Sequence, residues 1–334
     1  MSQTLLELDG ISKRFRRRIS FGERIAAKLG APIETREVRA VEDVSLSVVQ
    51  GETLGLVGES GCGKSTLGRI AAGILAPSSG TARLDGKPVM TGDGRHRKLT
   101  TRVQTVFQDP FASLNPRRRI GDAIAEGPLA HGLVDRAGSR TYVAEQLSRV
   151  GLDPSYASRF PHQFSGGQRQ RVAIARALAM KPDLLICDEP VASLDVSIQA
   201  QVLNLFLELR QALNLTAIFI SHDLGVVRHL SDRVAIMYLG RIVEIGPAAD
   251  IYAAPQHPYT QALLAGVPRL NRNRRGRHAF KPITGELPSP LAPPAGCHFH
   301  PRCSLADSIC RSQAPDLRQI GTERWAACHH AASG

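Results

Sequence analysis

The chain of 334 residues lacks the features of an integral membrane protein or a secreted protein. No uninterrupted apolar run approaches the roughly 20 residues that a membrane-spanning helix requires. The N-terminal sequence MSQTLLELDG has no basic start followed by an apolar core, which a secretion signal would show. We therefore expect a cytosolic protein that meets a membrane only through partners or through its surface charge.

Aromatic residues are also scarce, at 5% of the chain, which disfavours a surface that stacks single-stranded nucleic acid. Basic residues, in contrast, are abundant: the formal net charge is +12, and basic runs lie at 13–18 and 269–278. Such runs fit nucleic-acid binding, attraction to an anionic membrane surface or an ordinary solvated face. Of these, we expect no nucleic-acid partner.

Predicted strands alternate with predicted helices, which indicates an α/β fold with a largely parallel sheet. Residues 111–180 are predicted to be mainly helical, with breaks at proline and glycine, and the charged stretch 16–39 is predicted to be an inserted loop. Strands are predicted at 4–11, 40–49, 53–58, 81–84, 101–107, 183–190, 215–223, 233–240 and 241–246, and helices at 64–75 and 196–213.

Composition changes toward the C-terminus, where prolines, histidines and four of the six cysteines gather. We therefore divide the chain into a main α/β domain at 1–264, with a helical subdomain at about 111–180, and a small accessory region at 265–334. Hydrophobic residues make up 43% of the chain, which is enough for one substantial core.

The stretch GESGCGKST follows a predicted strand and precedes a predicted helix. It fits the pattern G-x-x-x-x-G-K-[ST] of a phosphate-binding loop, in which glycines let backbone amides surround the phosphates. The lysine of such a loop contacts the β- and γ-phosphates, and its serine hydroxyl binds Mg²⁺. The predicted nucleotide-binding residues are Gly58, Ser60, Gly61, Cys62, Gly63, Lys64, Ser65 and Thr66, with Ser65 also a Mg²⁺ ligand.

Two adjacent acids end the predicted strand LLIC, at the edge where α/β sheets bind ligands. Asp188 is suited to hold Mg²⁺, directly or through water, and Glu189 is suited to polarise an attacking water. A second anion site is predicted in FSGGQRQRVAIARAL, because a serine and two glycines open a helix whose first amides attract anions. One chain thus offers two phosphate-binding elements.

These motifs, followed by SLD and FISHD, resemble the ATP-binding subunit of an ABC transporter up to about Leu264. The resemblance implies a P-loop ABC-type ATPase domain with a mixed sheet and a helical subdomain, followed here by the cysteine-containing extension. It also implies a head-to-tail sandwich of two such domains, in which the signature motif touches the ATP on the partner's phosphate loop. The signature residues here are Ser165, Gly166, Gly167 and Gln168.

The resemblance implies roles for single residues as well. Gln108 matches a glutamine that binds Mg²⁺, senses the attacking water and couples the helical region to membrane subunits. Asp195 matches a residue that links the two ATP sites, and His222 matches a switch histidine on the γ-phosphate. The implied catalytic residues are Gln108, Glu189 and His222.

ATP and Mg²⁺ are therefore the expected cofactors. An aromatic side chain stacks on adenine in relatives, and Phe15 is expected to do so here. Tyr142 and Phe21 are the alternatives for that role.

Three stretches resemble di- and oligopeptide importers, a group that includes nickel importers: VFQDPFASLNPR, the insertion before VRAVEDVSL, and HPYTQALLAGVP followed by cysteines. The implied function is ATP hydrolysis that powers peptide import at the cytoplasmic face of the cell membrane. The implied partners are a second ATPase subunit, two transmembrane permease subunits and an extracytoplasmic substrate-binding protein. The alternatives are a nickel or other small-solute importer, a soluble ABC ATPase and a regulatory ATP sensor without turnover.

The tail contains Cys297, Cys303, Cys310 and Cys328, with five, six and seventeen residues between them. A cytosolic location disfavours disulfides, and the close cysteine pair of a structural zinc site is absent. Four thiolates also suit an iron–sulfur cluster, although the spacing is not that of ferredoxins. Importer ATPases resembling this chain can carry a 4Fe–4S cluster at such a tail, so we expect that cluster ahead of zinc or of four ordinary thiols. We expect a structural role for it, because nothing in the sequence places the tail near the ATP site.

Overall fold

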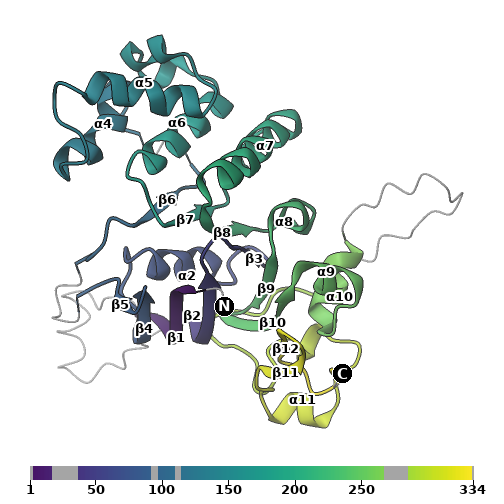
Figure 1. The fold of residues 1–334 in the computed structure, drawn as a ribbon. Helices are drawn as coiled ribbons and strands as arrows, with labels where there is room; N and C mark the ends of the chain where they lie inside the picture. Colours follow the sequence, from purple (N-terminus) through teal and green to yellow (C-terminus); the bar gives the residue numbers. More distant parts are fainter. Residues whose placement is uncertain (1–2, 17–36, 92–96, 110–113, 267–284, 333–334) are drawn as a thin grey trace, which may run out of the picture.

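The computed structural model describes residues 3–16, 37–91, 97–109, 114–266 and 285–332. Its strands form two sheets, with helices packed on and beyond them (Figure 1). The smaller sheet consists of β1 (Thr4–Arg16), β2 (Glu37–Val49), β4 (Ser79–Leu84) and β5 (Lys87–Pro88). The larger sheet consists of β3 (Thr53–Val57), β6 (Val103–Val106), β7 (Leu184–Asp188), β8 (Thr216–Ser221), β9 (Arg233–Tyr238), β10 (Arg241–Pro247), β11 (Arg318–Gly321) and β12 (Arg324–Ala326).

The larger sheet is parallel in its centre and antiparallel at one edge. Its order is β11-β12-β10-β9-β3-β8-β7-β6, and the five strands from β9 to β6 run parallel. Strands β10, β12 and β11 follow with antiparallel pairing, and the smaller sheet is antiparallel throughout. Strands β3, β7 and β8 are buried along their whole length, as expected for a parallel sheet covered on both faces. The predicted α/β class with a mixed sheet is confirmed.

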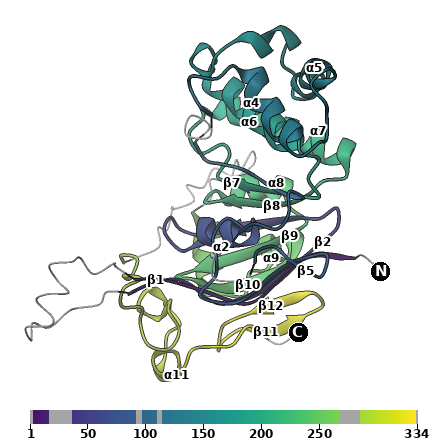
Figure 2. The ribbon, with the colours of Figure 1, turned by 90° about the vertical axis from the view of Figure 1, so that its left-hand side faces the viewer.

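The helices divide into those beside the sheets and a separate helical layer. The layer lies at one end of the molecule in Figure 2, and the C-terminal segment lies at the other. Among the described residues, no helix combines the length and the apolar character needed to cross a membrane. The layer contains α4 (Ile120–Ala130), α5 (Ser139–Arg149) and α6 (Gly166–Leu178). The other helices are α2 (Lys64–Ala71), α7 (Val196–Leu213), α8 (Leu224–Leu230), α9 (Ala248–Ala253), α10 (Pro258–Ala265) and α11 (Ser308–Ser312).

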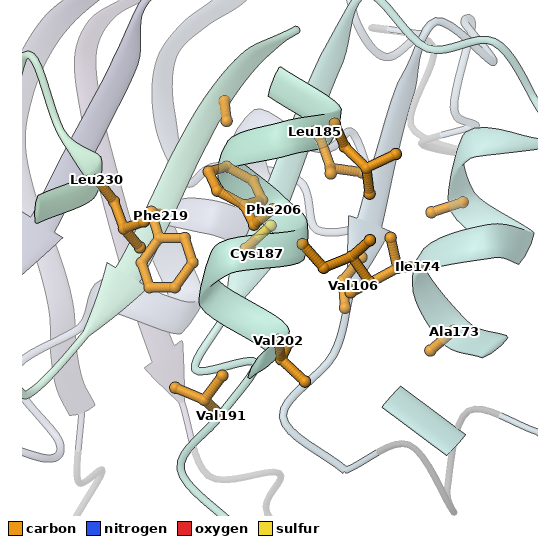
Figure 3. Packing of buried hydrophobic residues seen from close by; sticks show 14 of the residues in the cluster. Val106, Ala173, Ile174, Leu185, Cys187, Val191, Val202, Phe206, Phe219 and Leu230 are labelled. Atoms are coloured by element: carbon orange, nitrogen blue, oxygen red, sulfur yellow. The ribbon is translucent and has the colours of Figure 1, made fainter. Parts of the chain in front are cut away.

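Helix α7 has the bounds that its apolar spacing predicts. Its buried residues are Val202, Leu205, Phe206 and Leu209, which recur at the spacing of one helix face. Figure 3 shows this face against the sheet, where the ring centroids of Phe206 and Phe219 are 5.5 Å apart in an edge-to-face arrangement. The contact joins α7 to β8, so the helix is held directly behind the strands that end at the candidate site.

Two other predicted elements differ in length. The helix predicted at 64–75 ends at Ala71, because Gly73 has a φ of +68° and its N–H donates to the Ile70 carbonyl instead of continuing the helix. The predicted loop at 16–39 is shorter at both ends, because β1 extends to Arg16 and β2 begins at Glu37. Residues 17–36 lie outside the described residues.

The C-terminal segment continues the main sheet. Strand β12 pairs with β10, with Glu244 opposite Ala326 and Ile245 opposite Trp325. The sequence predicts no strand after residue 246, because β11 and β12 span only four and three residues and have no alternating pattern of their own. The accessory region is therefore joined to the α/β domain by backbone hydrogen bonds.

An aromatic cluster holds the same segment from a second side. Phe299 is 2% exposed, and its ring centroid lies 5.3 Å from that of Tyr238 on β9 and 5.3 Å from that of Tyr259 on α10. Burial of a side chain of this size contributes about 2 kcal/mol. The cysteine-containing tail is thus packed on the end of the nucleotide domain.

Our first prediction concerns His257, which is 1% exposed at the N-terminus of α10, where its Nδ1 accepts a hydrogen bond from the Tyr259 N–H. Burial lowers the pKa of His257 to about 3. Between pH 6.5 and 3 the unfolded chain binds a proton at this residue and the folded chain does not, so folding stability should fall as pH drops, by about 1.4 kcal/mol per pH unit. Above pH 6.5 the residue should contribute no pH dependence.

The variant His257→Asn keeps a side chain that caps the helix but does not titrate. Urea unfolding of both proteins between pH 7.5 and 4.5, followed by the fluorescence of the single tryptophan, should show a shallower fall in stability for the variant. Parallel pH profiles would contradict the assignment, whatever the offset between the two curves.

Candidate nucleotide site

The phosphate loop joins β3 to α2, as predicted, and two of its glycines are required by close packing. A Cβ on Gly58 would lie 2.1 Å from the Met237 carbonyl oxygen, and one on Gly63 would lie 2.0 Å from the Ala40 carbonyl oxygen. Gly63 also has a φ of 107°, in the left-handed region that favours glycine. The loop is therefore pressed against β9 and β2, and its backbone path depends on glycine at both positions.

Lys64, the first residue of α2, lies folded back into the loop. Its Nζ donates hydrogen bonds to the carbonyl oxygens of Gly58 at 2.8 Å and Glu59 at 2.9 Å, and the residue is 4% exposed. These contacts hold the ammonium inside the loop, at the N-terminus of a helix, where an anion is favoured.

The next residue of α2 contacts the end of β7. The Ser65 hydroxyl donates to Asp188 Oδ1 at 2.7 Å. Burial raises the pKa of Asp188, while the hydrogen bond from Ser65 and the charge of Arg69 act in the opposite direction. A hydroxyl and a carboxylate therefore meet beside the phosphate loop, and such oxygens are the ligands that Mg²⁺ prefers. Two of the three predicted Mg²⁺ ligands are thus adjacent.

The third predicted ligand, Gln108, lies with the predicted catalytic residues. Its Nε2 donates to Glu189 Oε2 at 3.4 Å, and the same oxygen is 3.2 Å from Nδ1 of His222. The three residues follow β6, β7 and β8, so three neighbouring parallel strands bring them together. The Glu189 side chain is 13% exposed and that of His222 is 56% exposed, which leaves the histidine accessible to a ligand.

The backbone of Glu189 is in a strained conformation. Its φ is 47°, and its N–H donates to the Ile220 carbonyl oxygen at 3.0 Å, which holds it beside β8. A non-glycine residue in this region costs about 1–3 kcal/mol, and such strain gathers at functional sites. In this turn the Glu189 carboxylate contacts both Gln108 and His222.

The signature motif begins α6, in agreement with its sequence pattern. Ser165 precedes the helix; the Gln168 N–H donates to its hydroxyl at 3.4 Å, and the Ser165 N–H donates to Gln168 Oε1 at 3.0 Å. A Cβ on Gly167 would lie 2.4 Å from Ile198, so α6 approaches α7 closely at this point. Asp195 precedes α7. Figures 1 and 2 show the start of α6 in the helical layer and α2 beside the sheets, so the two anion sites belong to different parts of the molecule.

The predicted adenine-stacking residue lies on the smaller sheet. Phe15 is on β1, is 41% exposed and has the Lys13 Nζ 5.3 Å from its ring centroid. Tyr142, one alternative, lies on α5, and its hydroxyl donates to the Ala179 carbonyl oxygen at 2.6 Å within the helical layer. The other alternative, Phe21, lies outside the described residues. The stacking role of Phe15 stays a prediction.

The structure also shows contacts at the phosphate loop that the sequence did not reveal. The Arg302 guanidinium binds both carboxylate oxygens of Glu59, at 2.6 and 2.9 Å. The Glu59 N–H donates to the Tyr259 hydroxyl at 2.8 Å. The expectation that nothing places the tail near the ATP site is therefore wrong, because the segment between Cys297 and Cys303 lies directly against the phosphate loop. In the sequence, the pattern CHFHPRC is the signal that could have pointed to this contact, because it places an arginine beside the tail cysteines.

A glycine loop around a buried lysine, a hydroxyl and a carboxylate suited to a divalent cation, and a second carboxylate beside a histidine match what hydrolysis of a nucleoside triphosphate requires. Together with a second helix start that bears the serine–glycine signature, they define the class of protein as a P-loop ATPase of the ABC type.

Comparisons with known proteins identify the family. The ABC transporter profile matches residues 41–192, and the profile of the oligopeptide/dipeptide transporter C-terminal region matches residues 243–310. An oligopeptide transport ATP-binding protein AppF of Bacillus subtilis is 47% identical over 98% of this chain and 97% of its own length. A di/tripeptide transport ATP-binding protein DppF of Pseudomonas aeruginosa is 50% identical over 88% of this chain and 91% of its own. The chain belongs to the ABC transporter ATP-binding proteins, and the predicted resemblance is confirmed.

Two solved structures share the fold. One is cbiO1 of Clostridium perfringens, part of the ABC transporter complex cbiONQ, with a TM-score of 0.60, 29% identity, and coverage of 75% of this chain and 91% of that one. The other is the ATP-binding cassette MJ0796, a dimer in a post-hydrolysis state bound to ADP and Pi, with a TM-score of 0.60, 25% identity, and coverage of 73% and 99%. The chain is accordingly an ABC-type ATPase.

Our second prediction concerns Glu189. The variant Glu189→Gln keeps the shape of the side chain but loses the charge that would polarise water. ATP hydrolysis should fall by at least about 100-fold, because general-base catalysis contributes that much. ATP affinity should stay close to that of the parent protein, since the phosphate loop is unchanged.

Lys64→Ala provides the contrast, because it should fail at ATP binding itself. Equilibrium binding of a fluorescent ATP analogue and phosphate release measure the two steps separately. Near-normal turnover in Glu189→Gln would remove Glu189 as the base, and tight ATP binding with full activity in Lys64→Ala would contradict the role of the loop.

Proposed function

We propose that this chain hydrolyses ATP to power the import of di- or oligopeptides through a membrane ABC transporter, at the cytoplasmic face of the membrane. The observation that carries the proposal is the match of residues 243–310 to the oligopeptide/dipeptide C-terminal region. The relatives named for oligopeptide and di/tripeptide transport support it, because their similarity extends over nearly the whole chain. A nickel or other small-solute importer is the alternative.

The arrangement of the site supports a role for each residue in turnover. Backbone amides of Gly58–Thr66 surround the phosphates, and Lys64 neutralises the β- and γ-phosphates. Ser65, Asp188 and Gln108 would hold Mg²⁺, which balances charge on the β- and γ-oxygens when bound. Glu189 orients and polarises the attacking water, and His222, hydrogen-bonded to Glu189, contacts the γ-phosphate.

We infer that Ser165, Gly166, Gly167 and Gln168 bind the ATP of a second ATPase subunit. They lie at a helix N-terminus in the helical layer, apart from the chain's own phosphate loop (Figure 1). Two subunits facing head to tail would bring each signature to the other's ATP, with Asp195 linking the two sites. ATP then holds the dimer together, and its hydrolysis releases it.

A groove between the sheet and the helical layer suits the proposed permease partner. It has a volume of about 740 Å³ and contains exposed apolar side chains, among them Leu99 at 53% and Ile74 at 49% exposure. Phe107, the residue before Gln108, also lines it. A permease segment in this groove would therefore lie next to the glutamine that contacts Glu189. Such a placement would couple transport to ATP hydrolysis.

The third prediction tests transport with the full assembly. The chain would be reconstituted in vesicles with its second ATPase subunit and two permease subunits, and supplied with binding protein and labelled di- and tripeptides. Peptide should stimulate ATP hydrolysis and accumulate in proportion to it. Ser165→Arg should abolish both effects while ATP still binds to the variant's own phosphate loop.

The outcomes separate the alternatives. Accumulation of Ni²⁺ without peptide would favour the nickel importer, and ATPase activity indifferent to the membrane subunits would favour a soluble ATPase. Binding of ATP without any turnover would favour the regulatory ATP sensor.

We further propose that the four tail cysteines hold a 4Fe–4S cluster. All six cysteines of the chain are free thiols, and the Cys297 N–H donates to the Cys310 carbonyl oxygen at 2.8 Å. Burial raises the pKa of Cys297 to about 11, and the charges of Cys310, Cys328 and Cys303 add to the rise. The donor set of four thiolates fits an iron–sulfur cluster, which would link the segments that carry them.

Zinc is the competing occupant. Four sulfurs around one zinc ion would lie about 4 Å apart, given a Zn–S distance of about 2.3 Å. Within the described part of the chain, the only group of three or more ligand atoms within 4.8 Å of one another is Asp307, Cys310 and His330, and the other three sulfurs are outside it. In the described residues the four sulfurs therefore do not form the close group that one zinc ion bound by all four would need.

The fourth prediction is that anaerobically purified protein is brown and contains iron and acid-labile sulfide in near-equal amounts. Cys303→Ser should remove both, while Cys187→Ala, a change in the core of the nucleotide domain, should keep them. Colourless protein with one equivalent of zinc would overturn the proposal.

A further inference from the structure

Glu59, the second residue of the phosphate loop, is held through three separate groups. Its carbonyl oxygen accepts a hydrogen bond from the Lys64 ammonium at 2.9 Å, and its N–H donates to the Tyr259 hydroxyl at 2.8 Å. Its carboxylate forms a two-bond ion pair with Arg302 at 2.6 and 2.9 Å. We propose that Arg302 is a positioning residue for the phosphate loop, through which the C-terminal tail controls ATP affinity.

The surroundings of Arg302 make this contact rigid. Its side chain is 5% exposed, against 26% for Glu59, and it also donates to the Tyr238 hydroxyl at 3.4 Å. Its guanidinium carbon lies 5.9 Å from the centroid of the Tyr238 ring. Two-bond arginine–carboxylate pairs constrain the geometry of both side chains more than single, exposed ion pairs do. The ion pair therefore fixes the path of the loop at Glu59.

The charge of Arg302 also determines whether its removal weakens or strengthens ATP binding. A carboxylate at Glu59 lies one residue from Gly58 and repels phosphate unless it is neutralised. Arg302 cancels this charge and keeps the carboxylate turned toward the tail. Without the arginine, Glu59 carries an uncompensated charge at the edge of the phosphate site, and the residue loses the side-chain contact among its three tethers. ATP should bind more weakly as a result.

The position of Arg302 in the tail connects the tail cysteines to the phosphate loop, and this is the basis of the proposed regulation of ATP affinity. It ends the short 3₁₀ turn His300–Arg302, and the next residue is Cys303. Phe299, before the turn, is packed between Tyr238 and Tyr259. A change at the cysteines is thus one residue from the arginine that holds the phosphate loop. This regulatory part rests on the proposed tail cluster, whereas the positioning role of Arg302 does not.

Arg324 offers a matched control. It also connects the tail to the main domain by a partly buried ion pair, with its Nη2 3.2 Å from Glu244 Oε1. Its side chain is 14% exposed, and Glu244 lies on β10. Removing Arg324 weakens the attachment of the tail without touching the phosphate loop.

The fifth prediction uses the full-length protein and a fluorescent ATP analogue with Mg²⁺, without peptide or membrane. Arg302→Ala should raise the Kd for the nucleotide about tenfold, the scale of a typical coupling between sites. Arg302→Lys should recover part of the affinity, because it restores the charge but not both hydrogen bonds. Adding Glu59→Gln to Arg302→Ala should also recover affinity, because the repelling charge is gone.

Arg324→Ala should lower the melting temperature and leave the Kd unchanged. An unchanged Kd in Arg302→Ala, an equal rise in Arg324→Ala, or no recovery with Glu59→Gln would overturn the proposal. Iron content is measured for each variant, and a rise in Kd found only where iron is lost would also overturn the direct role of Arg302. Failure of peptide uptake leaves these binding measurements unaffected, so the two proposals are tested separately.

Discussion

The parallel pairing of β3, β8 and β7 is the constraint on which the whole nucleotide site depends. Val57 lies opposite Ser221, and Asp188 lies opposite Ile220, so the three strands end at one edge within about a residue of one another. A different chemical group lies at the end of each strand: the phosphate loop after β3, His222 after β8, and Asp188 and Glu189 at the end of β7. Because hydrogen bonds between buried strands fix the register, none of these groups can shift alone.

Close packing adds a second constraint, since the loop has no room for side chains at Gly58 and Gly63. The loop is bounded by β9 and β2 on one side and by Tyr259 and Arg302 on the other. A backbone enclosed in this way can direct its amides at phosphate without rearrangement, which is what a preorganised anion site requires. The tail contributes Arg302 to this enclosure, so part of the C-terminal segment is in direct contact with the phosphate loop.

Much of this arrangement is predictable from local pattern. The apolar spacing of 196–213 predicts α7 to the residue, and Ser165 with two glycines predicts the start of α6. Strong periodicity and helix-start signals depend on neighbours in the sequence, which is why they can be read from it. The predicted length of the helix after the phosphate loop is too great. The chain leaves the helix in a left-handed turn at Gly73, and apolar spacing does not reveal such a turn. Strands β11 and β12 escape notice because their pairing with β10 exists only in the folded chain.

Local sequence motifs specify the chemical groups of the candidate site: a glycine-rich loop with a lysine, two acids at the end of a buried strand and a helix start that carries the signature. Those features are local, because the residues that define each motif and its geometry lie close together in the sequence. The contact between the tail and the phosphate loop depends on the three-dimensional fold, because Arg302 and Glu59 are 243 positions apart and no periodicity connects them. Their contact follows from the burial of Phe299 against Tyr238 and Tyr259, a packing event in which three distant segments share one apolar cluster.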